Sequence, residues 1–142
     1  MFRAIMFLIT FLTTNHVLAC SCNSSSINER FNEAESVFLG KVHSIIAKGE
    51  SNQFGEERIV VTFNVKQPFK NANELITLDT FDNKVSCEGY WFKEGHEYLV
   101  YAYKTEGRLS TFICGGVLLK DTKKDSVFLK QLKQLKQLKI YE

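Results

Sequence analysis

Residues 37–42 of this 142-residue chain read Val37-Phe38-Leu39-Gly40-Lys41-Val42, and this stretch decides the fold class. Aliphatic and aromatic residues dominate it, which is typical of a strand, and we expect the strand to begin at Ser36 and to continue to Ile46. A glycine inside a strand marks a bulge or a tight bend. Gly40 therefore predicts a strand that bends, as the strands of a small barrel do.

Four further short strands follow, separated by polar turns. They are expected at residues 58–65, 75–78, 97–104 and 109–113. Alternation places four apolar residues on one face of the first of them: Ile59, Val61, Phe63 and Val65. Pro68 is expected to end that strand, because proline cannot donate a ladder hydrogen bond. Five short strands with a helix at each end indicate a mainly β protein built as a small closed barrel.

Helices are expected at both ends of the barrel. Ser26 and Glu29 have the spacing of a capping box, and the apolar residues after them predict a short amphipathic helix that ends near Glu35. In the tail, residues 121–142, the triplet Gln-Leu-Lys occurs three times in succession and places leucines at 129, 132, 135 and 138. A period of three falls short of the helical repeat, so this leucine stripe drifts by about 60° per step.

Two interpretations of the tail stay open. The leucines of an amphipathic helix would pack on the barrel while the lysines face water. Alternatively, a basic amphipathic helix would lie on a membrane or on a partner.

The first 19 residues have the pattern of an export signal. Arg3 gives a basic start, an apolar run extends from Ala4 to Leu12, and the segment ends in Val17-Leu18-Ala19. Such an end suits signal-peptidase cleavage after Ala19. Cys20 would then be the first residue of the mature protein and would carry a free α-amino group. The barrel domain is expected to comprise residues 20–120.

Composition limits the class of protein further. Hydrophobic residues make up 44% of the chain and aromatic residues 13%, which is enough for a packed core and argues against disorder. The net charge of +2 is too small to indicate a nucleic-acid partner. No segment has the roughly 20 consecutive apolar residues that a membrane span needs. Membrane association is therefore expected only if Cys20 is lipidated or the C-terminal helix binds a surface.

All four cysteines lie after the leader: Cys20, Cys22, Cys87 and Cys114. An even number behind an export signal indicates two disulfides formed in an oxidising compartment, so we expect a secreted, extracellular or periplasmic protein. Four cysteines allow three pairings. A Cys20–Cys22 bridge would close a very tight ring, which favours the two long-range pairings without choosing between them.

Other interpretations of Cys20-Ser21-Cys22 stay open. The residues Val17-Leu18-Ala19-Cys20 are similar to a lipobox, although a small residue is expected where Leu18 stands. A lipid thioether would consume the thiol of Cys20 and would leave it no disulfide. A redox or metal-binding role lacks a partnering His or Lys signature.

The sequence carries no Ser-His-Asp signature, no glycine-rich phosphate loop and no dinucleotide fingerprint. His43 and His96 lie far apart and outside any His-Glu-x-x-His motif, so both are expected to be structural, and no intrinsic metal site is expected. Glu88 and Glu94 are expected to face solvent rather than to form a catalytic pair. The aromatic residues 90–92 are expected to pack in the core or at its rim. We therefore expect a protein that is not an enzyme and that needs no cofactor.

Cys20-Ser21-Cys22, the helix after it and residues 37–42 together resemble the N-terminal domain of the tissue inhibitors of metalloproteinases, which is a netrin-like module. The resemblance continues through residues 61–65 and through Ser86-Cys87-Glu88-Gly89, and it reaches Cys114. It covers nearly all of residues 20–120. The placement of the cysteines is its most specific part.

The resemblance implies a five-stranded OB-type Greek-key barrel with the disulfides Cys20–Cys87 and Cys22–Cys114. It implies that the α-amino nitrogen and the carbonyl oxygen of Cys20 chelate the catalytic zinc of a target metalloproteinase, so the zinc belongs to the target. Ser21 would enter the specificity pocket of that protease. The other implied contacts are Cys22, Asn23, Val85 and Ser86. The alternative is a netrin-like extracellular or envelope-associated binding module, possibly lipidated at Cys20, without inhibitory activity.

Overall fold

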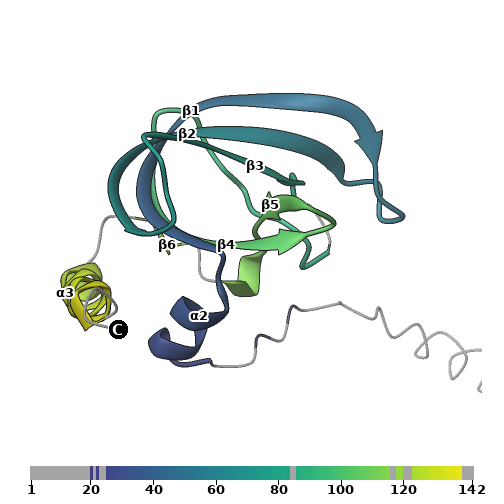
Figure 1. Cartoon of the computed structure of the whole chain (residues 1–142). Helices are drawn as coiled ribbons and strands as arrows, with labels where there is room; N and C mark the ends of the chain where they lie inside the picture. Colours follow the sequence, from purple (N-terminus) through teal and green to yellow (C-terminus); the bar gives the residue numbers. More distant parts are fainter. Residues whose placement is uncertain are drawn as a thin grey trace, which may run out of the picture.

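The computed structural model describes Cys20, Cys22 and residues 25–83, 86–115, 118–119 and 123–138. Within these residues the protein is mainly β, with five antiparallel strands in a nearly closed, barrel-like sheet and two α-helices beside it (Figure 1). This is the fold class that the sequence predicts. The expected leader, residues 1–19, lies outside the described residues.

The strands follow one another across the sheet in the order β3-β2-β1-β4-β5. They are β1 (Ser36–Ser51), β2 (Glu57–Lys70), β3 (Leu75–Phe81), β4 (Glu97–Thr105) and β5 (Arg108–Ser110). A sixth strand that the sequence did not predict, β6 (Leu118–Leu119), pairs with β4. The order places β3 and β5 at opposite ends of the path, where a curled sheet can bring them together.

Side chains close the barrel between β3 and β5. The two strands lie near each other, and among the described strands the backbone ladders join every neighbouring pair along the order but not this one. The hydroxyl Oγ1 of Thr80 donates a hydrogen bond of 2.7 Å to the carbonyl oxygen of Thr111. Arg108 lies 3.6 Å from the carboxylate of Asp79. The result is a five-stranded barrel of OB type that lacks a ladder at its closing seam.

Strand β1 bends at the glycine that the sequence marks. The register between β1 and β2 shifts between Leu39 and Gly40, as expected for a bulge. A Cβ atom at Gly40 would lie 3.1 Å from two ring carbons of Phe38, so the bend leaves little room for a side chain there. Strand β1 pairs with β2 along one edge and with β4 along the other.

Both faces are buried along Ser36–Gly40 of β1 and Tyr98–Ala102 of β4, and each face belongs to a different core. The barrel interior contains Phe38, Val42, Ile59, Val61, Phe63, Ile76, Leu78, Phe92, Tyr98, Val100 and Ala102. The second core, between the barrel and the helices, contains Phe31, Ala34, Val37, Leu39, Phe69, Leu99, Tyr101 and Leu132. The continuous apolar runs of these two strands are explained by this arrangement, since a strand covered on one face only would alternate.

Helix α2 (Ile27–Glu33) begins at the predicted capping box. The hydroxyl of Ser26 accepts a hydrogen bond from the backbone N–H of Glu29, and the carboxylate of Glu29 accepts one from the N–H of Ser26. Hydrogen bonding of this carboxylate, first to the backbone N–H of Ser26 and then to the Ser26 side chain, lowers the pKa of Glu29 below its usual range. The helix ends two residues earlier than expected. Lys70 donates hydrogen bonds to the carbonyl oxygens of three residues at this end: Phe31, Asn32 and Ala34.

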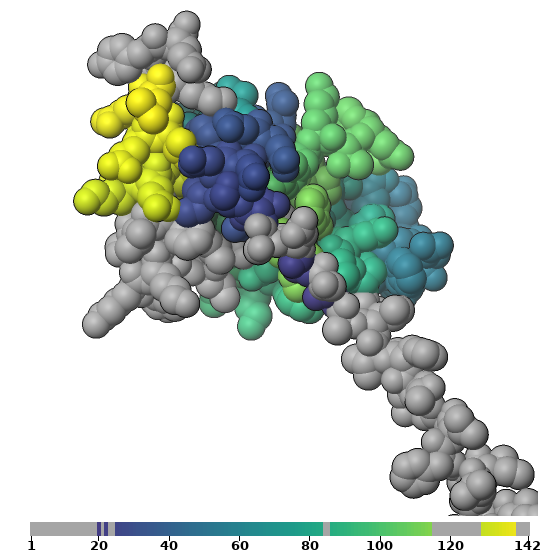
Figure 2. Space-filling model, turned by 90° about the horizontal axis from the view of Figure 1, so that it is seen from below, coloured from purple at the N-terminus to yellow at the C-terminus, as the bar shows by residue number. Residues whose placement is uncertain are grey.

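Helix α3 (Lys123–Leu138) packs beside α2 (yellow and dark blue in Figure 2). Leu132 is fully buried, Leu129 and Leu135 are partly buried, and the side chain of Leu138 is 66% exposed. The leucines therefore turn progressively from the core toward solvent along the end of the helix, as the three-residue period predicts. Within the described part of the chain, neither α-helix is long and apolar enough to cross a bilayer.

The prediction that Pro68 ends the second strand is wrong, because β2 continues to Lys70. Strand β3 pairs with β2 only from Arg58 to Asn64, so beyond this point β2 has a single ladder partner, β1. A missing N–H is tolerated at such an edge. The register with β1 also shifts next to Pro68.

The prediction of a fifth strand over 109–113 is also wrong in extent. Strand β5 ends at Ser110, and Ile113–Gly115 form a 3₁₀ turn, η2. The side chain of Thr111 is buried and donates a hydrogen bond of 2.9 Å to the carbonyl oxygen of Tyr101. This side-chain bond attaches the chain to β4 at the point where the backbone ladder between β4 and β5 has ended.

We predict that Gly89→Ala destabilises the fold strongly. Gly89 has a φ of 144°, and a Cβ atom there would lie 2.1 Å from the carbonyl oxygen of Phe81. Strain and overlap together should lower the free energy of unfolding by about 3 kcal/mol or more in urea denaturation. The control is Gly107→Ala, at a φ of 80° with nothing within 4 Å, which should cost about 1 kcal/mol. Equal losses in the two variants would contradict the close contact.

Candidate functional site

Two disulfides attach the N-terminal segment to the barrel. Cys20 is bonded to Cys87 and Cys22 to Cys114, with Cα–Cα distances of 5.7 and 5.2 Å. Of the two long-range pairings that the sequence leaves open, this is the one that the resemblance implies. Each bridge joins residues more than 60 positions apart, with separations of 67 and 92. Two such bridges are typical of an oxidising, extracellular-type environment.

The structure describes three of the expected site residues, which are Cys20 in the first bridge, Cys22 in the second, and Ser86 beside Cys87. Cys20 is half-buried, Cys22 is exposed, and Ser86 is half-buried directly beside Cys87. The remaining expected contacts, Ser21, Asn23 and Val85, lie outside the described residues. The bridge thus brings Cys20 to the loop between β3 and β4.

A hairpin turn from elsewhere in the chain holds this loop. We name the hydrogen-bonded group Asn52, Glu56, Ser86 and Glu88 the hairpin clasp. Its first two residues belong to the turn between β1 and β2, and its last two flank Cys87. Glu56 is fully buried, and its carboxylate accepts a hydrogen bond of 2.6 Å from the N–H of Ser86 and another from the Ser86 hydroxyl.

Asn52 builds the turn and also reaches across it. Its side-chain oxygen accepts hydrogen bonds from the N–H groups of Phe54 and Glu56, at 2.9 and 3.0 Å. Its amide nitrogen donates to the carboxylates of Glu56 at 2.9 Å and Glu88 at 3.3 Å. The turn and the Cys87 loop therefore share one polar network.

The sequence did not reveal this network. The polar stretch 49–57 predicts a loop, but the loop is shorter than that, because β1 extends to Ser51 and β2 begins at Glu57. Glu56 and Glu57 are adjacent and chemically identical, and no local pattern tells which of them is buried. Their difference arises only when the hairpin folds over a loop 30 residues further along the chain.

The far side of the Cys87 loop is fixed to the end of β3 and to the residues that follow it. Gly89 forms an isolated parallel bridge with Phe81. Asn83, which is buried and has a φ of 41°, donates a hydrogen bond of 3.0 Å to the carbonyl oxygen of Gly89. Cys87 is thus held from the hairpin on one side and from β3 on the other.

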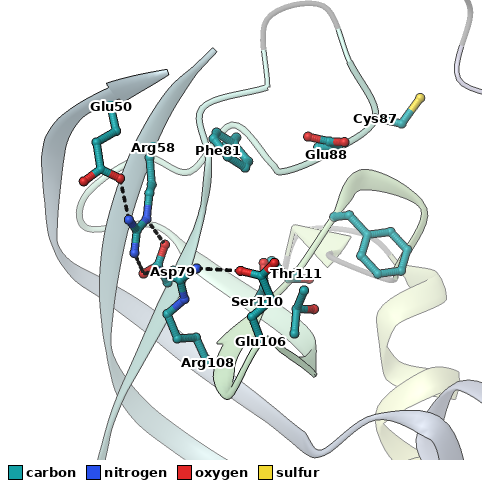
Figure 3. A pocket seen from close by; sticks show the side chains of 12 residues that line it. Glu50, Arg58, Asp79, Phe81, Cys87, Glu88, Glu106, Arg108, Ser110 and Thr111 are labelled. Atoms are coloured by element: carbon teal, nitrogen blue, oxygen red, sulfur yellow. Dashed lines mark hydrogen bonds and ion pairs between the residues drawn. The ribbon is translucent and has the colours of Figure 1, made fainter. Parts of the chain in front are cut away.

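A cleft of about 710 Å³ opens next to Cys87, between the β1–β2 hairpin, the end of β3 and the β4–β5 hairpin (Figure 3). Most of its lining residues are polar or charged, and two are phenylalanines. The lining residues are Glu50, Arg58, Asp79, Phe81, Cys87, Glu88, Thr105, Glu106, Arg108, Ser110, Thr111 and Phe112.

An ion-pair network centred on Asp79 forms one wall of this cleft (Figure 3). Arg58 donates two hydrogen bonds to the carboxylate of Asp79, at 2.7 and 2.5 Å, and one of 2.5 Å to Glu50. The hydrogen bonds from Arg58 lower the pKa of Asp79 below its usual range, although partial burial opposes this shift. The same bonds raise the pKa of Arg58 further above its usual range. The network joins β2, β3 and the end of β1.

The histidines and the remaining acidic candidates are not brought together as a site. His43 and His96 are both exposed, and the described residues contain no group of three or more potential metal ligands. The carboxylate of Glu94 accepts a hydrogen bond of 2.9 Å from the N–H of Ile45, whereas that of Glu88 belongs to the hairpin clasp. Both glutamates have exposed side chains that serve the local backbone and loop structure.

The aromatic residues 90–92 divide between core and surface. Phe92 is buried, Tyr90 packs against the barrel core, and the side chain of Trp91 is 52% exposed. Phe92 makes edge-to-face contacts with Phe63 and Tyr98, at ring-centroid distances of 5.3 and 5.1 Å. The run serves mainly to pack the barrel interior, as expected.

Neither the protein-family models nor the curated proteins compared with this chain match it. The likeness to the metalloproteinase inhibitors therefore remains a resemblance. Its fold and its disulfide pairing agree with the structure, and its zinc-binding chemistry is a separate hypothesis.

We predict that the Asp79 network stabilises the fold at neutral pH and loses this effect in acid. The folded-state pKa of Asp79 lies below its unfolded value, so the stabilisation is complete above about pH 5 and is lost as the pH falls through the lowered pKa. Urea denaturation of the wild type and of Asp79→Asn should therefore differ most near pH 7 and converge in acid. Glu74→Gln, at an exposed carboxylate, serves as the control. A difference that stays constant down to pH 2 would refute the role of the ion pairs.

Proposed function

We propose that the protein is a secreted inhibitor of zinc metalloendopeptidases, with the mature N-terminus as its inhibitory element. In this proposal residues 1–19 are removed on export, and the α-amino nitrogen and carbonyl oxygen of Cys20 chelate the zinc of the target. The observation that carries the proposal is the Cys20–Cys87 disulfide, which attaches the first mature residue to a loop held on both sides.

The proposed chemistry needs only the backbone atoms of one residue. A catalytic zinc has three protein ligands and a fourth position held by water. An amine and a carbonyl of the same residue form a five-membered chelate that can replace this water. The α-amino group has a pKa near 8, so roughly a tenth to a fifth of it is unprotonated at pH 7, and the metal displaces the remaining protons.

The disulfides support this role through the entropy of binding. A free N-terminus frays, and ordering it in a complex would weaken the affinity. Here Cys20 and Cys22, two residues apart, are each bonded to a different part of the barrel. The segment between them would enter the target already ordered, with Ser21 directed to the specificity pocket. In the proposal Asn23, Val85 and Ser86 add contacts beside it.

The disulfide also bears on the alternative that Cys20 is lipidated. A thioether to lipid and a bond to Cys87 both require the same sulfur atom, so the two states exclude each other. The observed Cys20–Cys87 bond favours the unlipidated form, released into the extracellular space or the periplasm. A netrin-like binding module without inhibitory activity would share this structure, and inhibition assays distinguish it from an inhibitor.

We predict that extending the mature N-terminus by one alanine abolishes most of the inhibition. The extra residue moves the free amine away from the carbonyl of Cys20 and removes the five-membered chelate. Titration of a panel of zinc endopeptidases with the native and the extended protein would measure the inhibition constants, and thermal unfolding should be unchanged. Equal potency of the two forms would reject zinc chelation by Cys20.

We predict that Ser21→Gly changes selectivity between proteases and leaves stability unchanged. Its side chain is proposed to enter a pocket of the target, where its loss affects each protease differently. Inhibition constants against several zinc endopeptidases should change by unequal factors. A large drop in melting temperature with uniform factors would show a structural role instead.

A further inference from the structure

The hairpin clasp connects the turn between β1 and β2 to Cys20. Glu56 bonds Ser86, Ser86 precedes Cys87, and Cys87 is disulfide-bonded to Cys20. The path from the carboxylate to the N-terminal residue thus consists of hydrogen bonds, one peptide bond and one disulfide. A displacement of the turn would be transmitted to the N-terminus along it.

The burial of Glu56 is not needed to form the turn. The side-chain oxygen of Asn52 already accepts hydrogen bonds from two N–H groups of the turn, and Gly55, with a φ of 74°, provides its left-handed residue. A turn at the tip of a hairpin is normally solvated, and a buried carboxylate is unfavourable unless donors satisfy it. Glu56 is nevertheless 0% exposed. Its partners across the loop account for this burial.

The geometry of these bonds fixes Ser86 in place as well as in orientation. One carboxylate oxygen accepts from the backbone N–H of Ser86, and the other accepts from its hydroxyl. The same hydroxyl oxygen accepts a hydrogen bond of 3.0 Å from the N–H of Glu88. Cys87 therefore lies between two residues that are both bonded into the hairpin clasp.

We infer that Glu56 is a positioning residue for the N-terminus, which fixes Cys20 through Ser86 and Cys87. An effect of Glu56 on inhibition rests on the proposed function. In that function the β1–β2 hairpin would align Cys20, the chelating residue, through Glu56. Glu56 itself touches neither the target nor the zinc. Its contribution is to restrict the loop that carries the disulfide.

Glu56→Gln tests this role, with Glu57→Gln as the matched control. The amide of Gln has one donor group where the carboxylate has an acceptor, so at least one of the hydrogen bonds from Ser86 or Asn52 is lost. Glu57 loses the same charge one residue away, and its hydrogen bonds of 3.0 Å with Asp82 use its backbone N–H and carbonyl. Both variants would be prepared as the processed, fully disulfide-bonded protein.

The first measurement is the NMR spectrum of protein labelled with ¹³C at cysteine, which does not depend on inhibition. Glu56→Gln should shift or broaden the Cα and Cβ signals of Cys20 and Cys87. The signals of Cys22 and Cys114 are the internal reference and should stay in place. Glu57→Gln should leave all four unchanged. Unchanged Cys20 and Cys87 signals in Glu56→Gln would overturn the inference.

The second measurement is the inhibition constant against a zinc endopeptidase that the wild type inhibits, well below the melting temperature. Loss of a hydrogen bond to a charged group should raise it roughly tenfold or more in Glu56→Gln. Little change is expected in Glu57→Gln, and equal constants for the two variants would overturn the inference. If the wild type inhibits no zinc protease, the proposed function fails, whereas the cysteine spectra still decide whether Glu56 positions Cys20.

A second variant covers the case in which Glu56→Gln does not fold. Ser86→Ala removes the hydroxyl bond to Glu56 and retains the backbone bond. It should produce a smaller displacement of the Cys20 and Cys87 signals in the same direction. Cysteine spectra identical to those of the wild type would again overturn the inference.

Discussion

The first part of β1 and the middle of β4 are buried on both faces, and this double burial determines how the other elements are arranged. These two adjacent strands form the boundary between the barrel interior and the core under the helices, so each must supply apolar side chains to both. Phe38 and Val100 face the interior, whereas Val37 and Tyr101 face the helices. The helices and the outer strands are then positioned around this pair.

The candidate site lies where the barrel is least constrained by its own ladder, beside the end of β3. Here the disulfides, the hairpin clasp and the Gly89 bridge hold the loop in place, as strand ladders hold the rest of the barrel. Two of these three devices act on the residues immediately around Cys87. A segment fixed in this way loses little conformational entropy in a complex, which suits a surface that binds a partner without changing shape.

Much of the fold could be predicted because its signals are local. The capping box of Ser26, the bend at Gly40 and the drifting leucine stripe each depend on neighbours within a few residues. The end of β2 could not be predicted from Pro68, because the tolerance for proline depends on where β3 stops pairing. Glu56 was missed for the same kind of reason, since its burial depends on a loop distant in sequence. For the site, the positions of the cysteines predicted the two disulfides. No local sequence pattern predicted the polar network that holds the loop around Cys87.

The side-chain closure between β3 and β5 has a consequence for how the domain moves. Backbone ladders open cooperatively over several residues, but here the sheet ends are joined by contacts such as that of Thr80 with Thr111. Opening the barrel along this line would break no strand ladder among the described residues. Such an opening would widen the neighbouring cleft, because Asp79 lies both at this seam and in the cleft wall.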